Sequence, residues 1–142
     1  MMEVRPARED DTGAVAALGE QLRYEVTATE VAERLASIAR DPEAAVLVAE
    51  VEGSVVGWIH VYGVTWVQMG RFAGVGGMVV ADERRGEGIG SRLLEAAETW
   101  ARDRSYPLIR VRSNVIRDRA HSFYIERGYQ TEKQLFSFLK VL

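Results

Sequence analysis

The sequence predicts a single α/β domain in which helices flank a mixed β-sheet, and three observations support this prediction. Apolar β-branched runs at 45–51 and 55–62 are separated by Glu52-Gly53-Ser54, a pattern typical of a β-hairpin. A β-branched segment at 74–81 leads through a glycine-rich loop into an amphipathic helix and then a further strand, which predicts a parallel crossover. Two amphipathic helical patterns precede the hairpin.

The first forty residues contain one short strand and these two helices. Val4 to Ala7 is predicted to be an edge strand, and Asp10 or Asp11 can cap the first helix. Thr27 and Glu30 have the spacing of a capping box at the start of the second helix, which is expected to end before Asp41-Pro42. The apolar positions that define the two helical faces are Ala14, Val15, Leu18 and Leu22, then Val31, Leu35 and Ile38.

The middle of the chain carries the strand and helix of the crossover. Residues 64–72 have no clear pattern, whereas 74–81 is predicted to be a strand interrupted at Gly76-Gly77 by a bulge or by close approach of a ligand. The helix after the glycine-rich loop directs one apolar face inward, formed by Ile89, Leu93, Leu94, Ala97, Trp100 and Ala101.

The last third predicts a strand, a short helix and a final strand. Pro107 introduces a strand in which Ile109 and Val111 alternate with arginines. A short helix bears Phe123 and Tyr124, and the apolar run from Leu135 to Val141 predicts a last strand.

Composition narrows the class of protein. A chain of 142 residues can form one domain (1–142) with a substantial core, and the absence of cysteine excludes disulfides, thiolate metal sites and a cysteine-bound acyl intermediate. No apolar run approaches the length of a membrane span, so we expect a cytoplasmic protein without a membrane partner. The net charge of −3 gives no general attraction to nucleic acid.

The loop from Arg85 to Ser91 is the strongest chemical signal. Its glycines, Gly86, Gly88 and Gly90, let backbone N–H groups approach a ligand, and the helix that begins there adds unpaired amides, so an anion such as phosphate is the expected ligand. The loop lacks the Gly-Lys-Ser/Thr ending of a mononucleotide-binding loop and the third glycine of a dinucleotide fingerprint.

What remains is the pattern RxxGxG from Arg85 to Gly90, and here the chain resembles the GCN5-related N-acetyltransferase (GNAT) family. A second segment, from Asn114 through Ala120, Phe123 and Tyr124 to Gly128-Tyr129, resembles the other conserved region of that family. The resemblance implies a mostly antiparallel sheet of GNAT type and acetyl-CoA as the acetyl donor. It also implies contacts with the donor from the main chain of one strand, from the loop and from two side chains: Met78, Val79 and Val80; Arg85, Gly86, Glu87, Gly88, Ile89, Gly90 and Ser91; and Asn114 and Tyr124.

The resemblance also assigns the catalytic role. Tyr124 stands where the family has its general acid, and a phenol with an ordinary pKa of about 10 can protonate a departing thiolate. The other interpretation of Tyr124 is an aromatic that anchors its helix. Asn114 is expected to bind the cofactor, the alternative being a turn residue.

The proton acceptor for the attacking amine is not assigned by the sequence. Many relatives have a glutamate on the strand before the loop, but the segment from Gly74 to Val80 has no acid. Glu25 or Glu50 could act through water, although such residues are more often simply solvated. His60, in the hairpin, could face the acceptor cleft or pack in the sheet, and packing is favoured because the sequence shows no partner for it.

His121 is interpreted as an exposed helix residue rather than a proton relay, and neither histidine has the spacing of a metal ligand, so no metal is expected. The resemblance places four aromatic residues, Tyr24, Trp58, Tyr62 and Trp66, on segments that wall the acceptor cleft, with core packing as the alternative.

The function predicted is direct transfer of acetyl from acetyl-CoA to a primary amine in a ternary complex, with a small-molecule acceptor favoured. The alternatives are acetylation of a protein lysine or N-terminus and a noncatalytic acyl-CoA sensor. The apolar segment from Leu135 to Leu142 predicts either a homodimer contact or a strand inside the sheet.

Overall fold

The computed structural model describes residues 1–113 and 118–142 as two compact units, Met1–Val111 and Arg112–Leu142, each of which is described by itself. The first unit contains a five-stranded sheet in the order β1-β2-β3-β4-β5. The strands are β1 (Met2–Pro6), β2 (Ala44–Val51), β3 (Ser54–Trp66), β4 (Gly70–Val80) and β5 (Ile109–Val111). Neighbouring strands are antiparallel except β4 and β5, which are parallel, so the predicted mixed, mostly antiparallel sheet is confirmed.

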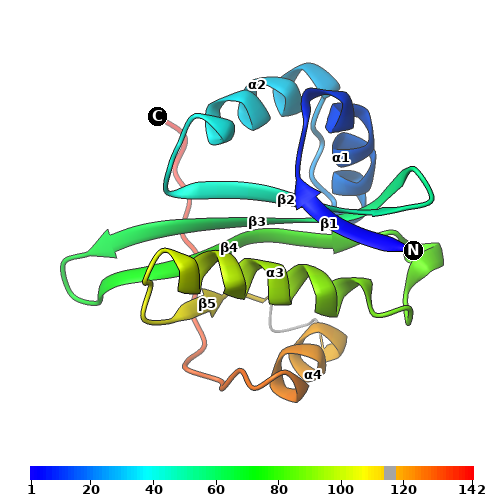
Figure 1. Cartoon of the computed structure of the whole chain (residues 1–142). Coiled ribbons are helices and arrows are strands. Elements are labelled where there is room, and N and C mark those ends of the chain that lie inside the picture. Colours follow the sequence, from blue (N-terminus) through cyan, green and yellow to red (C-terminus); the bar gives the residue numbers. More distant parts are fainter. Residues whose placement is uncertain (114–117) are drawn as a thin grey trace. The chain divides into compact units, whose positions relative to one another are not determined.

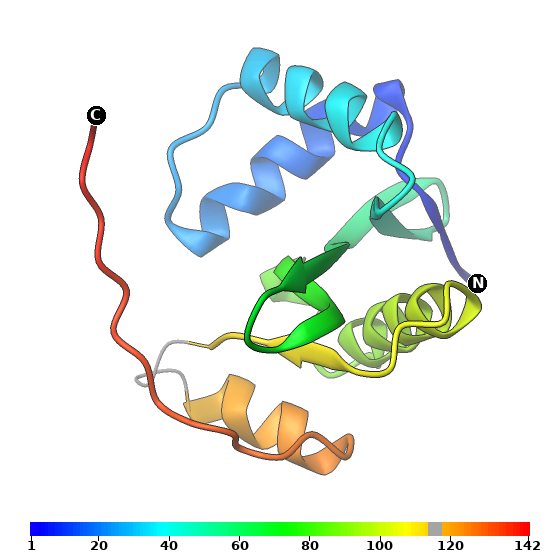
Figure 2. The same ribbon diagram turned by 90° about the vertical axis from the view of Figure 1, so that its left-hand side faces the viewer.

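Helices cover both faces of this sheet (Figures 1 and 2). The helices α1 (Thr12–Gly19) and α2 (Ala28–Ala39) lie on one face, where Trp58 of β3 donates from Nε1 to the carbonyl oxygen of Val15. The helix α3 (Ile89–Asp103) lies on the other face, where Leu93 and Ile89 pack against Gly57. The predicted inward face of α3 is confirmed, because all six of its apolar residues are buried.

The local turn and cap signals are also confirmed. Thr27 accepts from the N–H of Glu30 at 3.1 Å, and the N–H of Thr27 donates to Glu30 Oε1 at 2.9 Å, which completes the capping box of α2. Glu52 and Gly53 adopt the positive φ angles that the tight β2–β3 turn requires. Residues 64–72, which had no clear pattern, form the end of β3, a turn and the start of β4.

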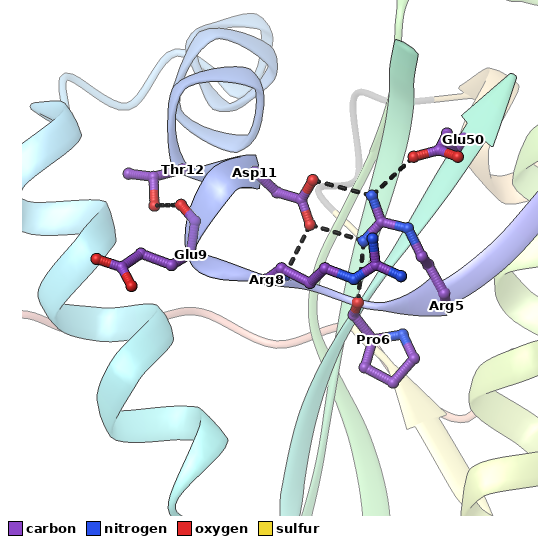
Figure 3. Close-up of polar contacts among 7 residues, drawn as sticks. All are labelled: Arg5, Pro6, Arg8, Glu9, Asp11, Thr12 and Glu50. Atoms are coloured by element: carbon purple, nitrogen blue, oxygen red, sulfur yellow. Dashed lines mark hydrogen bonds and ion pairs between the residues drawn. The ribbon is translucent and has the colours of Figure 1, made fainter. Parts of the chain in front are cut away.

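The sequence suggested that Asp10 or Asp11 caps the first helix. Asp11 stands at the N-cap position of α1, but its side chain makes no capping hydrogen bond. Its carboxylate instead forms two hydrogen bonds with the guanidinium of Arg5, at 2.8 and 3.0 Å, and accepts the N–H of Arg8 (Figure 3). Arg5 also donates to Glu50 at 2.9 Å. The Arg5 and Asp11 side chains are only 8% and 7% exposed, so this cluster joins β1, β2 and the start of α1 through buried charges.

The second unit contains the helix α4 (Asp118–Glu126), as predicted around Phe123 and Tyr124. The predicted strand from Leu135 to Val141 is wrong: this segment forms no strand in the structure. A strand requires a hydrogen-bonding partner, and the described part of this unit contains a helix and no strand.

Candidate functional site

The open edge of β4 is the first part of the site. Strand β5 pairs only with Ala73, Gly74 and Val75, while β3 pairs with β4 as far as Val80. From Gly76 onward, therefore, β4 has no strand neighbour on its β5 side among the described residues. The irregularity predicted at Gly76-Gly77 is confirmed, because the register shifts there: His60 pairs with Gly77 and Val61 with Val75, which leaves Gly76 as the extra residue.

Main-chain direction distinguishes the three predicted residues on this edge. The N–H of Ala81 donates to Val56 on β3, and the carbonyl oxygen of Val79 lies close to Gly57 of the same strand. Because successive residues of a strand direct their main-chain groups to opposite edges, those of Met78 and Val80 point to the open edge. Val79 therefore contributes its buried side chain rather than an open-edge amide.

The loop after β4 has the backbone conformation of an anion-binding turn. A short 3₁₀ helix, η3 (Asp82–Arg84), is followed by Gly86 and Gly88 with φ angles of 86° and 80°. Gly88 is the N-cap of α3 and provides no side-chain acceptor for the first amides of that helix. Left-handed glycines followed by an uncapped helix N-terminus are well suited to bind an anion through main-chain N–H groups.

The charged side chains of the loop are paired with one another. Arg85 contacts Asp82 at 2.8 Å, and Arg84 contacts Glu87 at 3.2 Å. All four side chains are substantially exposed, and such surface pairs contribute little free energy. The guanidinium of Arg85 can therefore exchange its partner for a bound anion at small cost.

Two residues fix the ends of the loop. Ile89 is 2% exposed and packs into the core, so it anchors the start of α3 rather than contacting a ligand with its side chain. Gln21 donates to the carbonyl oxygen of Val80 at 2.9 Å and accepts the N–H of Asp82 at 3.3 Å, which holds the start of the loop. Sequence reasoning missed Gln21, because nothing local indicates a contact with a residue 59 positions away.

An aromatic row lies across the bulged part of β4. Trp58, His60 and Tyr62 alternate along β3 and therefore lie on one face of the sheet, with the His60 and Tyr62 ring centroids 5.8 Å apart. The rings extend over glycines of β4: a Cβ placed on Gly77 would contact Trp58, one on Gly76 His60, and one on Gly74 Tyr62.

The other predicted acceptor aromatics lie elsewhere in the first unit. Trp66 packs edge-to-face on Phe72 near the β3–β4 turn, and Tyr24 is exposed.

Burial lowers the pKa of His60, so its imidazole is neutral at pH 7.

Tyr124 lies in the second unit, in α4. Its ring contacts those of Phe123 and Tyr129, with centroids 5.3 and 5.7 Å away, and its carbonyl oxygen accepts the N–H of Tyr129. The predicted cofactor residue Asn114 lies outside the described residues.

Three properties of the described residues bear on other kinds of site. A groove of about 460 Å³ between β1 and α3 is lined by residues that include Arg5, Arg92 and Trp100, but by none of the predicted site residues. Residues 1–113 and 118–142 contain no group of three or more acidic, histidine or cysteine side chains placed to hold a metal ion. None of their helices is both long and apolar enough to cross a bilayer.

Comparisons with known proteins agree with this geometry. A family model described as the acetyltransferase (GNAT) family matches residues 12–129. The aminoalkylphosphonate N-acetyltransferase of Salmonella typhimurium strain LT2 is 33% identical over 147 residues, covering 99% of this chain and 91% of that protein.

Two solved structures share the fold at lower identity. The aminoglycoside N-acetyltransferase AAC(6')-Iy in complex with CoA superposes with a TM-score of 0.90 at 14% identity, covering 99% of this chain and 95% of the other. A protein described as a transcriptional regulator from Bacillus halodurans C-125 superposes with a TM-score of 0.89 at 21% identity, covering 99% and 100%. From the family match and the 33% identical relative together, the chain belongs to the acetyltransferase (GNAT) family and is an N-acetyltransferase.

Proposed function

We propose that this protein transfers the acetyl group of acetyl-CoA directly to the primary amine of a small molecule. The observation that carries the proposal is the open edge of β4, which leads through η3 into the left-handed glycines and the uncapped N-terminus of α3. A ligand with a pyrophosphate at one end and an amide-bearing arm is complementary to such a surface. The anion would bind the loop amides, and the amides of the arm would pair with the strand edge.

The residues of the loop and of the open edge of β4 fit acetyl-CoA in chemical type. The loop from Arg85 to Ser91 would hold the pyrophosphate, with the main chain of Glu87 and Gly90 among its donors. The open-edge groups of Met78 would pair with the arm, whereas the carbonyl oxygen of Val80 already accepts from Gln21. Bound acetyl-CoA supplies an electrophilic thioester, and the loop contacts use binding energy remote from the reacting carbonyl to position it.

Tyr124 is the proposed general acid, and Asn114 a proposed cofactor ligand. The Tyr124 hydroxyl would donate its proton to the departing thiolate, which is the role that the family resemblance gives it. The Tyr124→Phe variant keeps the ring that packs on Phe123 and Tyr129, so we expect its unfolding temperature to stay unchanged while kcat falls by about 10²-fold. Unchanged kcat would remove Tyr124 from the mechanism.

A small-molecule acceptor is favoured by the name of the 33% identical relative, an aminoalkylphosphonate N-acetyltransferase. The test is calorimetry with CoA, followed by thiol release from acetyl-CoA with a panel of aminoalkylphosphonates, aminoglycosides and diamines. We expect CoA binding and turnover with at least one member. Binding of CoA without any turnover would favour the sensor, and mass shifts on proteins alone would favour a protein acetyltransferase.

A homodimer through the C-terminal segment is proposed on a separate observation. Phe136 and Phe138 are 90% and 92% exposed, and Leu139, Val141 and Leu142 are exposed as well. An apolar segment with unpaired main-chain groups can pair with a second copy of itself across a two-fold axis. Light scattering should give twice the chain mass, and the Phe136→Ser, Phe138→Ser double variant should be monomeric. A monomeric wild-type protein would contradict the proposal.

A further inference from the structure

His60 lies at the open end of β4, and within residues 1–113 and 118–142 its side chain forms no hydrogen bond or ion pair. It comes from β3, pairs in register with Gly77 and points to the face that carries Trp58 and Tyr62. A Cβ built on Gly76 would lie 2.6 Å from His60 Nδ1 and 3.2 Å from its Cε1. The imidazole therefore occupies the space that a side chain at position 76 would take.

The location matters because of the direction of the bound donor. In the proposed function the pyrophosphate binds after Val80, and the arm then runs back along β4 through Met78. The reacting end of the arm thus reaches Gly77 and Gly76, where pairing with β5 has just ended. This is the part of the strand that the His60 ring covers.

The transfer needs a proton acceptor at that place. A primary amine has a pKa of about 10.4 and is almost entirely protonated at pH 7, so one proton must leave before attack and a second must leave as the bond to the acetyl carbon forms. From Gly74 to Val80, β4 offers glycine, valine and methionine and no side chain that could accept a proton.

We propose that His60 is the general base that takes the proton of the acceptor amine. The ammonium form first loses one proton to solvent. As the neutral amine nitrogen forms its bond to the acetyl carbon, a second N–H proton passes to an imidazole nitrogen. The carbon–sulfur bond breaks, and the thiolate takes a proton from the proposed acid, Tyr124. The products are an N-acetyl amine and CoA thiol, and proton exchange with solvent returns imidazolium and phenolate to their starting forms. The inference rests on the proposed acetyl transfer.

The surroundings of the ring suit this role. Burial alone lowers the pKa of His60, so the ring is a neutral acceptor at pH 7. Its strand neighbours on β2 and β4 are Val46 and Gly77, which carry no charge, and the titratable group beside it is Tyr62. Among residues 1–113 and 118–142 the imidazole has no hydrogen-bonding partner.

The first test uses the pH dependence of kcat to distinguish a His60 that acts as base from a His60 that only packs in the sheet. We expect His60→Gln to lower kcat at pH 7 by about 10²-fold and to abolish the acidic limb of the kcat profile. Its CoA affinity, measured by calorimetry, should match that of the wild-type protein. His121→Gln, which removes the other histidine, is the matched control and should keep the wild-type limb.

The second test measures the protonation of His60 directly and does not depend on turnover. With two histidines in the chain, imidazole NMR signals can be assigned by comparing the wild-type protein with His121→Gln. We expect the His60 signal to titrate below the ordinary histidine pKa of about 6.5, at the same pH as the acidic limb of kcat. Different midpoints for the signal and the limb would overturn the assignment.

A third variant moves the base to the other strand. Gly76 does not have a positive φ angle, so a side chain is allowed there once the ring is removed. We expect His60→Ala combined with Gly76→Glu to recover at least ten-fold of the kcat lost in His60→Ala, with the acidic limb at lower pH.

The outcomes distinguish the two proposals. Wild-type kcat and an unchanged acidic limb in His60→Gln would overturn the role of His60 while leaving acetyl transfer intact. Failure of the wild-type protein to bind CoA would overturn both. Loss of CoA affinity together with kcat in a folded His60→Gln protein would make His60 a binding residue and overturn its role as base.

Discussion

The interior of the sheet and the loop from Ala81 to Gly88 both depend on glycine, but for opposite reasons. In the sheet, Gly57 and Gly63 are needed because a neighbouring group fills the space of a Cβ. In the loop, Gly86 and Gly88 have open space around them, but both have positive φ angles. The sheet glycines therefore serve packing, and the loop glycines serve a backbone shape that directs main-chain donors outward.

The charged residues of the two regions differ in the same way. Arg5 is buried and bonded to Asp11 and Glu50, whereas Arg85 is exposed and has one pairing within its own loop. A buried charge that loses a partner is strongly destabilising, but an exposed one is not. The charged groups of the sheet region thus stabilise the fold, while those of the loop remain accessible to a ligand.

The largest expected effect is the loss of a buried ion pair. We expect Asp11→Asn to lower the free energy of unfolding by about 3–5 kcal/mol at pH 7, because Arg5 would keep Glu50 but lose its closer carboxylate. Urea denaturation measures the change. A loss below about 1 kcal/mol would show that the buried cluster behaves like the exposed pairs of the loop.

The same carboxylate gives a pH dependence. The hydrogen bonds from Arg5 hold the pKa of Asp11 below its ordinary value, so its contribution is complete above the unfolded pKa of about 3.9 and is lost as pH falls through the folded pKa. The difference in stability between wild type and Asp11→Asn should therefore shrink below about pH 4 and stay constant above it. A difference that does not shrink as the pH falls below about 4 would contradict this cause.

The next effect tests the packing role of a sheet glycine. A Cβ on Gly63 would lie 1.7 Å from the Tyr106 hydroxyl oxygen, so we expect Gly63→Ala to cost about 3 kcal/mol of unfolding free energy. Gly13 is the matched control, since it lies in α1 with nothing within 4 Å of a Cβ. Gly13→Ala should stabilise the protein by about 0.5–1 kcal/mol, and equal effects at the two positions would contradict the packing explanation.

The smallest loss of stability should come from the loop, together with a clear effect on binding. Gly88→Ala places an L side chain in the left-handed region, so we expect it to lower stability by about 1–2 kcal/mol and the affinity for CoA by at least ten-fold. The stability and CoA affinity of Gly88→Asn should lie between those of the wild-type protein and Gly88→Ala, because asparagine tolerates this conformation better than alanine. Calorimetry with CoA distinguishes the variants, and undiminished affinity in Gly88→Ala would mean that the loop shape does not serve the ligand.

Features that depend on a few neighbouring residues could be predicted from the sequence. The Thr27 and Glu30 capping box, the hairpin turn at Gly53, the inward face of α3 and the irregularity at Gly76 all follow from short-range backbone chemistry and periodicity. The glycine loop was predicted for the same reason.

The strand predicted at 135–141 was wrong. An apolar run shows that a segment is able to form a strand, but the strand forms only where the fold provides a partner for it. The proposed role of His60 as base was not predicted either, because the contact between its ring and Gly76 joins two different strands.

The amino-acid sequence by itself determined the fold class, the order of elements as far as α4 and the loop before α3, since these follow from residues within a few positions of one another. Only the tertiary structure decided that Asp11 pairs with Arg5 instead of capping α1, that Gln21 holds Val80, and that the His60 ring lies over Gly76. Such contacts join residues far apart in the chain. They form where strand register and helix packing bring those residues together, which no local pattern encodes.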